Sequence, residues 1–315
     1  MIATRPVLGL GWMVVSGLVA AQTFPSKALR IYTTEAGGAS DLPARMLARE
    51  FQAALGQPAV VENRSLIGVE IVAQASADGH TLLHYTSPLW ITPLFRSNVS
   101  WDMARDFAPI ALTVVTLNVL AVHPALPVKS VKDLIALAKR RPGELNYGSS
   151  STGSGNHISG ELLKSVAGIN IVRVAYKGAG SAINALISGE IQLAFPTIGS
   201  VKGHIQAGRI RALAITSVKR SQLAPELPTM IESGLPGYES ISYTGLFAPA
   251  RTPAPIIATL SQETMRTLRL PANKERLLLA GTEVVASTPA EAAATIKSEI
   301  ERVRKLVQDA GLKEQ

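Results

Sequence analysis

The sequence predicts an α/β protein, and two observations lead to this fold class. Short runs of β-branched and other apolar residues alternate along nearly the whole chain with segments of helical apolar spacing, which is typical of parallel sheets with helices on their faces. The 315 residues are 47% hydrophobic and 17% charged, a composition that can bury a sizeable core, and their length suits about two domains. After residue 25 no window holds the ~18 to 20 uninterrupted apolar residues of a membrane-spanning helix, so a globular protein is expected.

The first 21 residues have the pattern of a secretory signal. Arg5 precedes an apolar run over residues 7–21 that ends in small residues, and Gln22 follows. A buried first helix is the alternative, but the short run, its basic start and Pro25 soon after it favour export. We expect cleavage near Ala21 and a periplasmic protein. The sequence contains no Cys, which excludes a lipid-anchored cysteine, disulfides, thiol catalysis and cysteine zinc sites.

A strand, a loop and a helix are predicted next, in that order. Residues 29–34 read as the strand, 35–39 as the loop and 42–55 as the helix, whose apolar stripe ends before Gly56. Ser40 or Asp41 is the expected N-cap. The loop therefore directs free backbone N–H groups toward one point.

A second unit of the same kind is predicted in the middle of the chain. It has a strand end at 145–148, a Ser- and Gly-rich loop at 149–156, and a helix at 158–166 that Gly168 ends. The other predicted segments are a strand at 81–85, an apolar stretch at 107–122, a helix at 131–139, strands at 171–176, 191–195, 212–216 and 242–248, and helices with little strand over 255–312.

Two long extended segments, 110–123 and 241–249, suit crossings between two lobes. We therefore predict a discontinuous first lobe of residues 22–122 and 239–315, and a second lobe of residues 123–238.

The charge balance favours anionic partners. Lys and Arg number 31 against 23 Asp and Glu, a formal net charge of +8. The basic residues are spread singly, the longest cluster is 139–141, and the sequence has no basic stripe interleaved with aromatic residues. A nucleic-acid partner is not expected.

Enzymatic and metal signatures are missing from the sequence. It contains neither a nucleophile-elbow Gly-x-Ser-x-Gly nor a phosphate-binding Gly-x-x-x-x-Gly-Lys, and Ile158 stands where a dinucleotide motif starting at Gly153 needs its third Gly. His80 and His84 have the spacing of a helical zinc pair, but their sequence context is a strand, along which four residues span ~13 Å. Neither a metal nor a cofactor is expected.

An exported hydrolase that uses Ser154 and His157 remains an alternative. Both residues lie at the predicted start of a helix, beside several other hydroxyl residues. Adjacent side chains at a helix start rarely point at one another, and no local Asp is placed to orient the imidazole. The favoured interpretation is that the hydroxyls cap the helix and bind a ligand, while His157 packs or hydrogen-bonds nearby.

The positive signal is the pair of strand-to-helix loops, one in each predicted lobe. The start of a helix carries unpaired amides and the positive end of the helix dipole, so each loop can hold a carboxylate or another anion. A ligand at the carboxyl ends of the strands would meet both loops.

The mature chain resembles, over nearly its whole length, the receptor family of tripartite tricarboxylate transporters, also called Bug-type extracytoplasmic solute-binding proteins. The resemblance is carried by short motifs, which are Pro25-Ser26-Lys27, Gly37-Gly38 with Asp41 and Ala44-Arg45, Gly56-Gln57-Pro58, Val61-Glu62-Asn63-Arg64, Asp78-Gly79, Asp106-Phe107-Ala108-Pro109, Leu145-Asn146-Tyr147, Ser149 with Gly153, Ser154 and His157, Tyr176-Lys177-Gly178, Ala207-Gly208, Arg211-Ala212-Leu213-Ala214 and Gly234-Leu235-Pro236-Gly237.

This resemblance implies a type II periplasmic-binding-protein fold, in which two α/β lobes hold a small organic carboxylate in the cleft between them. It also implies that the protein captures its ligand and hands it to a membrane permease, without enzymatic activity; a sensor protein as the partner is the alternative. A monomer is expected. The ligand-binding residues expected on this basis are Thr33, Thr34, Gly37, Gly38, Ala39, Ser40, Asp41, Thr86, Ser87, Ser149, Ser150, Thr152, Gly153, Ser154, His157, Tyr176, Pro196, Thr197 and Tyr243.

Departures from the family pattern bear on the ligand. Where the family often has Phe-Asp-Asn, this chain has Phe195-Pro196-Thr197, so an Asp suited to a ligand amine is absent. A monocarboxylate, dicarboxylate or aromatic acid is therefore expected in preference to an amino acid. Trp90, Tyr176 and Tyr243 are candidates for an apolar wall of the site, and ordinary core positions are the equal alternative for each. Glu35 would repel an anion unless its side chain points outward.

Overall fold

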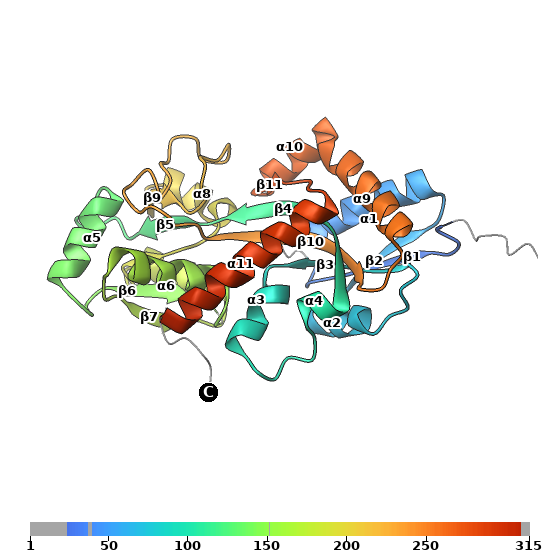
Figure 1. The fold of residues 1–315 in the computed structure, drawn as a ribbon. Helices are drawn as coiled ribbons and strands as arrows, with labels where there is room; N and C mark the ends of the chain where they lie inside the picture. Colours follow the sequence, from blue (N-terminus) through green and yellow to red (C-terminus); the bar gives the residue numbers. More distant parts are fainter. Residues whose placement is uncertain (1–23, 37–39, 151, 310–315) are drawn as a thin grey trace, which may run out of the picture.

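In the computed structural model, which describes residues 24–36, 40–150 and 152–309, the chain forms two β-sheets flanked by helices (Figure 1). The first sheet has the strand order β11-β4-β10-β3-β1-β2. Its strands are β1 (Leu29–Thr33), β2 (Ala59–Asn63), β3 (Thr81–Thr86), β4 (Phe107–Leu117), β10 (Ile241–Pro249) and β11 (Thr282–Val284). β1 pairs in parallel with β2 and β3, whereas β10 is antiparallel to β3 and β4.

The second sheet has the strand order β7-β6-β8-β5-β9. Its strands are β5 (Val119–Val122), β6 (Asn146–Ser149), β7 (Val172–Ala175), β8 (Leu193–Ala194) and β9 (Arg211–Ile215). β6 pairs in parallel with β7 and β8, and β5 is antiparallel to β8 and β9. Two mixed sheets that contain parallel strand pairs, together with the helices that flank them, confirm the α/β class.

The helices are α1 (Asp41–Leu55), α2 (Ser65–Ala73), α3 (Pro88–Phe95), α4 (Met103–Asp106), α5 (Val131–Arg140), α6 (Gly155–Ala167), α7 (Ala179–Ser188), α8 (Ile198–Gln206), α9 (Ala254–Arg269), α10 (Pro271–Leu279) and α11 (Pro289–Asp309). Gly56 and Gly168 follow α1 and α6 in the left-handed conformation, as the sequence predicts for helix ends. None of the helices in the described residues is long and apolar enough to cross a membrane.

Two segments connect the sheets. Asn118 separates β4 of the first sheet from β5 of the second, and residues 216–240 lead from β9 back to β10. The predicted crossings at 110–123 and 241–249 correspond to β4 with β5 and to β10. The sequence analysis assigned residues 119–122 to the first lobe, whereas their hydrogen bonds lie in the second sheet. The exact division into lobes stays a prediction.

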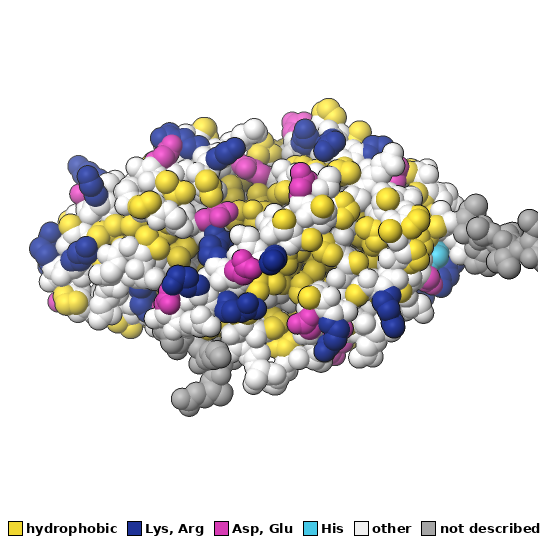
Figure 2. Space-filling view, viewed as in Figure 1, with side chains coloured by type: hydrophobic (Ala, Val, Ile, Leu, Met, Phe, Trp, Pro, Cys, Tyr) yellow, Lys and Arg dark blue, Asp and Glu magenta, His cyan; other side chains and the backbone are white. Residues whose placement is uncertain are grey.

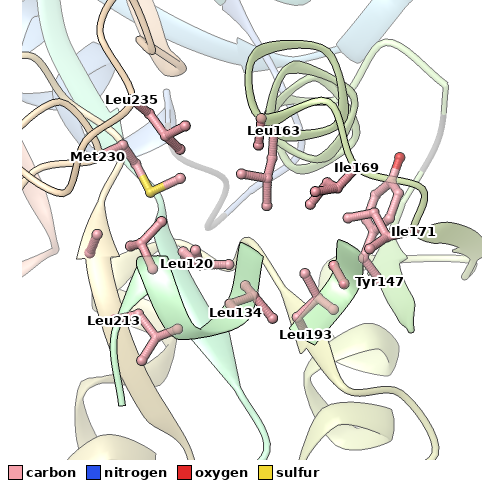
Figure 3. Packing of buried hydrophobic residues seen from close by; sticks show 14 of the residues in the cluster. Leu120, Leu134, Tyr147, Leu163, Ile169, Ile171, Leu193, Leu213, Met230 and Leu235 are labelled. Carbon is pink, nitrogen blue, oxygen red and sulfur yellow. The ribbon is translucent and has the colours of Figure 1, made fainter. Parts of the chain in front are cut away.

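Mostly aliphatic side chains from the strands of the second sheet and from the helices that cover it pack together to form a core (Figure 3). Leu134 of α5 and Leu163 of α6 pack with Leu120, Tyr147 and Leu193 from the strands. These large side chains are almost completely buried. This burial stabilises β6 and β8, whose carboxyl ends lead into the segments before α6 and α8.

Helix α11 packs against the cores of both sheets. Ala292, Ile296 and Val303 belong to the apolar cluster of the first sheet, together with Trp90 of α3. Leu306 belongs to the cluster of the second sheet. The helix runs diagonally from the first sheet to α6 of the second (Figure 1). Helix α11 thus contributes apolar side chains to the cores of both halves of the molecule.

Charges of both signs are interspersed on the face shown in Figure 2. The net charge of +8 is therefore not gathered into a single basic stripe on this face.

Candidate functional site

A cavity of about 260 Å³ is lined by residues from both halves of the molecule. Thr86, the last residue of β3, and Ser87, which precedes α3, contribute from the first sheet. The loop between β6 and α6 and the segment between β8 and α8 contribute from the second. The predicted site residues that line the cavity are Thr86, Ser87, Ser150, Gly153, Ser154, Pro196 and Thr197.

Helices α3, α6 and α8 begin at this cavity. Their N-cap residues are Ser87, Ser154 and Thr197, and all three line it. Ala179, the first residue of α7, lies in the same wall. The first amides of a helix have no intrahelical acceptor, and the helix dipole places partial positive charge at this end. The cavity wall is therefore suited to an anion.

The loop before α6 is held by Arg173 of β7, a residue absent from the sequence-based site. Its Nε donates to Ser149 Oγ at 2.7 Å, one terminal nitrogen donates to Thr152 Oγ1 at 3.1 Å, and the other donates to the carbonyl oxygen of Ser150 at 2.9 Å. Ser149 and Thr152, both predicted to bind ligand, thus bind this guanidinium and do not line the cavity. The pairing of β6 with β7 places Arg173 beside Tyr147, close to the loop.

Asn156 holds the same loop from its other side. Its Oδ1 accepts hydrogen bonds from Ser150 Oγ at 3.1 Å and from Ser154 Oγ at 2.5 Å. The hydroxyl of Ser154 therefore donates to an amide oxygen at the cavity wall.

His157 is buried next to the loop, and its Nδ1 accepts a hydrogen bond from the backbone N–H of Gly153 at 3.1 Å. Its ring centre lies 5.9 Å from that of Phe95 in α3. A hydrolytic dyad would need the Ser154 proton directed at the imidazole, and the observed hydrogen bond of Ser154 leads to Asn156 instead. This geometry favours the packing role expected for His157.

Gly153 lies where the two halves of the molecule touch. Its φ is +80°, a backbone conformation that L side chains rarely adopt. A Cβ atom at this position would lie 3.2 Å from Cδ2 of Phe95. Only glycine combines this backbone conformation with this close approach.

Four described residues of the first predicted site segment, Thr33, Thr34, Ser40 and Asp41, do not line this cavity. Ser40 Oγ is hydrogen-bonded to Thr33 Oγ1 at 2.8 Å and to Thr34 Oγ1 at 2.6 Å. The Asp41 carboxylate accepts from Asn63 Nδ2 at 2.8 Å and from Arg45 Nε at 3.1 Å. Gly37, Gly38 and Ala39 lie outside the described residues.

A buried histidine lies behind this loop. His84 Nδ1 donates to the carbonyl oxygen of Ser40 at 2.9 Å, and Nε2 contacts Thr113 Oγ1 at 2.9 Å. Burial lowers the pKa of His84 to about 4, so the ring is neutral at physiological pH. It serves as a fixed support for the start of α1.

The remaining candidates also lie away from the cavity wall. The Tyr176 hydroxyl donates to Glu190 at 2.7 Å, and Tyr243 lines a neighbouring groove. Trp90 is buried, with its Nε1 hydrogen-bonded to Glu299. Glu35 is exposed and accepts a hydrogen bond from Ser65 Oγ at 3.2 Å, which gives this carboxylate a partner at the surface.

Residues of α11 and of the two crossings complete the wall, and the sequence analysis did not identify them. Asn118 and Ser240 come from the crossings. Glu299, Arg302 and Leu306 come from α11. They lie far along the chain from the Ser- and Gly-rich loop, so no local motif connects them with it. Among residues 24–36, 40–150 and 152–309, no group of three or more His, Asp or Glu side chains is placed to hold a metal ion.

Residues 43–312 match the family model described as the tripartite tricarboxylate transporter family receptor. Protein BugT of Bordetella pertussis is 33% identical over 306 residues, which cover 95% of this chain and 94% of that protein. The solved structure of R. palustris Rpa4515 with adipate is 34% identical, has a TM-score of 0.78, and covers 91% of this chain and 98% of its own. MatC from Rhodopseudomonas palustris with bound malate is 28% identical, has a TM-score of 0.74, and covers 90% of this chain and 100% of its own. These similarities confirm the expected periplasmic-binding-protein fold.

Proposed function

We propose, from the premise that this chain belongs to the tripartite tricarboxylate transporter receptor family, that it captures a small organic carboxylate in the cavity between its two sheets. The observation that carries the proposal is the meeting of helix starts at one cavity. Ser87, Ser154 and Thr197, each the N-cap of a helix, all line it. Backbone amides and hydroxyls at these positions can bind a carboxylate without a charged side chain.

The bound acids of two neighbours support this ligand class. One neighbour was solved with adipate and another with malate, and both are small carboxylates. Binding without covalent change is the proposed activity. The Ser154 hydroxyl donates its proton to Asn156 and not to a base that would activate it as a nucleophile.

The proposed setting is the periplasm. Residues 1–21 carry the signal pattern, with cleavage near Ala21, and these residues lie outside the described part of the chain. A monomer that presents its liganded form to a membrane permease is the proposed mode of action.

Titration calorimetry against a panel of monocarboxylates, dicarboxylates, tricarboxylates and aromatic acids tests the function. At least one acid is expected to bind with a Kd of about 1 μM or lower, because helix-start amides and hydroxyls give several charge-assisted hydrogen bonds. Failure of every organic acid, together with binding of amines or sugars, would refute the proposal.

Arg173→Ala tests the loop geometry. The acid that binds best in the panel should lose about tenfold in affinity, because the contacts from Arg173 to Ser149, Ser150 and Thr152 disappear. The affinity of Arg173→Lys should lie between those of the wild type and Arg173→Ala, since an ammonium group cannot reproduce the forked hydrogen-bond geometry of the guanidinium. Arg209→Ala removes an exposed arginine and should bind as the wild type does. Equal affinity of Arg173→Ala and Arg209→Ala would mean that the loop keeps its shape without Arg173.

A further inference from the structure

A carboxyl group from the last helix forms part of the cavity wall. Glu299 of α11 lines the cavity, yet the residue is only 6% exposed. Acidic side chains are seldom buried unless they are paired. Its position in the wall of an anion-binding cavity is therefore a feature that the proposed function alone does not explain.

Glu299 is held at the start of α3. Its Oε2 accepts a hydrogen bond from Nε1 of Trp90, a residue in the first turn of α3, at 2.8 Å. A helix start attracts negative charge. The protein's own carboxyl thus lies beside the first turn of α3, where its charge would repel a ligand carboxylate, so the starts of α6 and α8 are better placed to bind one.

The charged neighbours of Glu299 do not supply a dedicated cation. Arg302, one turn further along α11, donates to the Glu239 carboxylate at 2.7 Å and to the backbone oxygen of Glu239 at 2.8 Å. Tyr243 of β10 faces the same groove, and burial, with a smaller effect from the charges of Glu239 and Glu299, raises its pKa to about 12. The charges of Arg302 and Glu239 neutralise each other in this ion pair. The negative charge of Glu299 is therefore not balanced by Arg302.

Burial raises the pKa of Glu299 to about 7, an effect that the hydrogen bond from Trp90 and the charge of Arg302 only partly oppose. At neutral pH the group is therefore a mixture of the ionised and the neutral form. In the ionised form it accepts hydrogen bonds and repels a nearby carboxylate.

The cavity wall consists of three chemically different parts, which are the helix starts, an apolar surface and the carboxyl group of Glu299. Loop residues such as Ser154 and Thr197 belong to the helix starts of the second sheet. Leu162, Phe195 and Leu306 add apolar surface to the same cavity. A ligand that fits all three parts has a carboxylate, an apolar body and a polar group that faces Glu299.

We infer that Glu299 is a specificity-determining residue, which selects carboxylates that carry a hydrogen-bond-donating hydroxyl at their far end over those that carry a second carboxylate. This inference rests on the proposed function, because it assumes that the first carboxylate binds at the helix starts. A hydroxyl can donate to Glu299, whereas a second carboxylate can only accept.

The test compares matched acids of three to eight carbons, each length as the ω-hydroxy acid and as the dicarboxylate, by titration calorimetry with the full purified protein. At pH 8, where Glu299 is mostly ionised, the hydroxy acid is expected to bind about tenfold more tightly than the dicarboxylate of the same length. In Glu299→Gln this ratio should fall to about one or reverse, because an amide can donate to a second carboxylate. Glu301→Gln removes an exposed charge from the same helix and should keep the wild-type ratio.

A second measurement needs no substitution. Between pH 8 and pH 6 Glu299 gains a proton, while the ligand carboxyl groups, with pKa values below about 6, stay mostly ionised. The wild-type protein should therefore bind the dicarboxylates up to about tenfold more tightly at pH 6, with little change for the hydroxy acids.

The outcomes separate the two claims. Suppose that acids bind, but that the ratio of hydroxy-acid affinity to dicarboxylate affinity is the same in the wild type and in Glu299→Gln, or does not change with pH. Either result would overturn the role of Glu299 and leave the proposed function standing. If no acid of any length binds either protein, the proposed function itself fails, and the inference fails with it.

Discussion

Gly153→Val is expected to reduce carboxylate affinity by about tenfold or more, while the protein stays folded. The φ of +80° at this position is unfavourable for a β-branched residue, and the new Cβ would crowd the ring of Phe95. The loop would have to move, which would displace Ser154 and the start of α6 from the cavity wall. Titration calorimetry with the best acid of the panel measures the loss.

Gly208→Val is the matched control for this substitution. Gly208 has a φ of +68°, so the backbone penalty is similar, but nothing lies within 4 Å of a Cβ added there. This variant should lose stability and keep its affinity. Equal losses of affinity in both variants would show that general destabilisation, and not the geometry of the site, is the cause.

Gly160→Ala is expected to lower the free energy of unfolding by about 1 to 3 kcal/mol. A Cβ on Gly160 of α6 would lie 2.5 Å from Cζ and 2.7 Å from Cδ2 of Tyr147. This ring is fully buried, and its hydroxyl donates to Glu161 at 2.6 Å, so it has little freedom to move away. Urea denaturation monitored by circular dichroism measures the change.

Gly203→Ala provides the comparison within a helix. Gly203 lies in α8, and nothing lies within 4 Å of an added Cβ. Alanine should stabilise this helix by about 0.5 to 1 kcal/mol, because glycine loses more backbone entropy on folding. If Gly160→Ala proved as stable as Gly203→Ala, the close packing of α6 on Tyr147 would be refuted.

Helices with strong local signals were predicted well from the sequence. The apolar spacing and the terminal glycines predicted α1 and α6 to within a few residues. Short helices were missed, among them α3, which carries Pro88 at its start and Pro93 within it, and α8, which contains Gly199 and Gly203. Packing against the sheets stabilises such segments, and a single sequence does not display that packing.

The two Ser- and Gly-rich loops show the same limit at the site. Both were expected to face the ligand, and several residues of the second line the cavity. In the first loop, the Ser40 hydroxyl is hydrogen-bonded to Thr33 and Thr34. The Asp41 carboxylate accepts hydrogen bonds from Asn63 and Arg45. A hydroxyl or carboxylate that can bind a ligand can equally bind a neighbour, and the residue type alone does not distinguish the two.

The amino-acid sequence by itself determined the α/β class, the family and the glycine-rich helix starts, because these depend on local spacing and on short motifs. Only the tertiary structure decided which of these starts share a cavity, that Glu299 lines it, and that Arg173 holds the loop before α6. Trp90 and Glu299 are 209 residues apart in the chain and 2.8 Å apart in space. Such a meeting is set by how α11 packs across both sheets, a property of the whole folded chain that no local segment encodes.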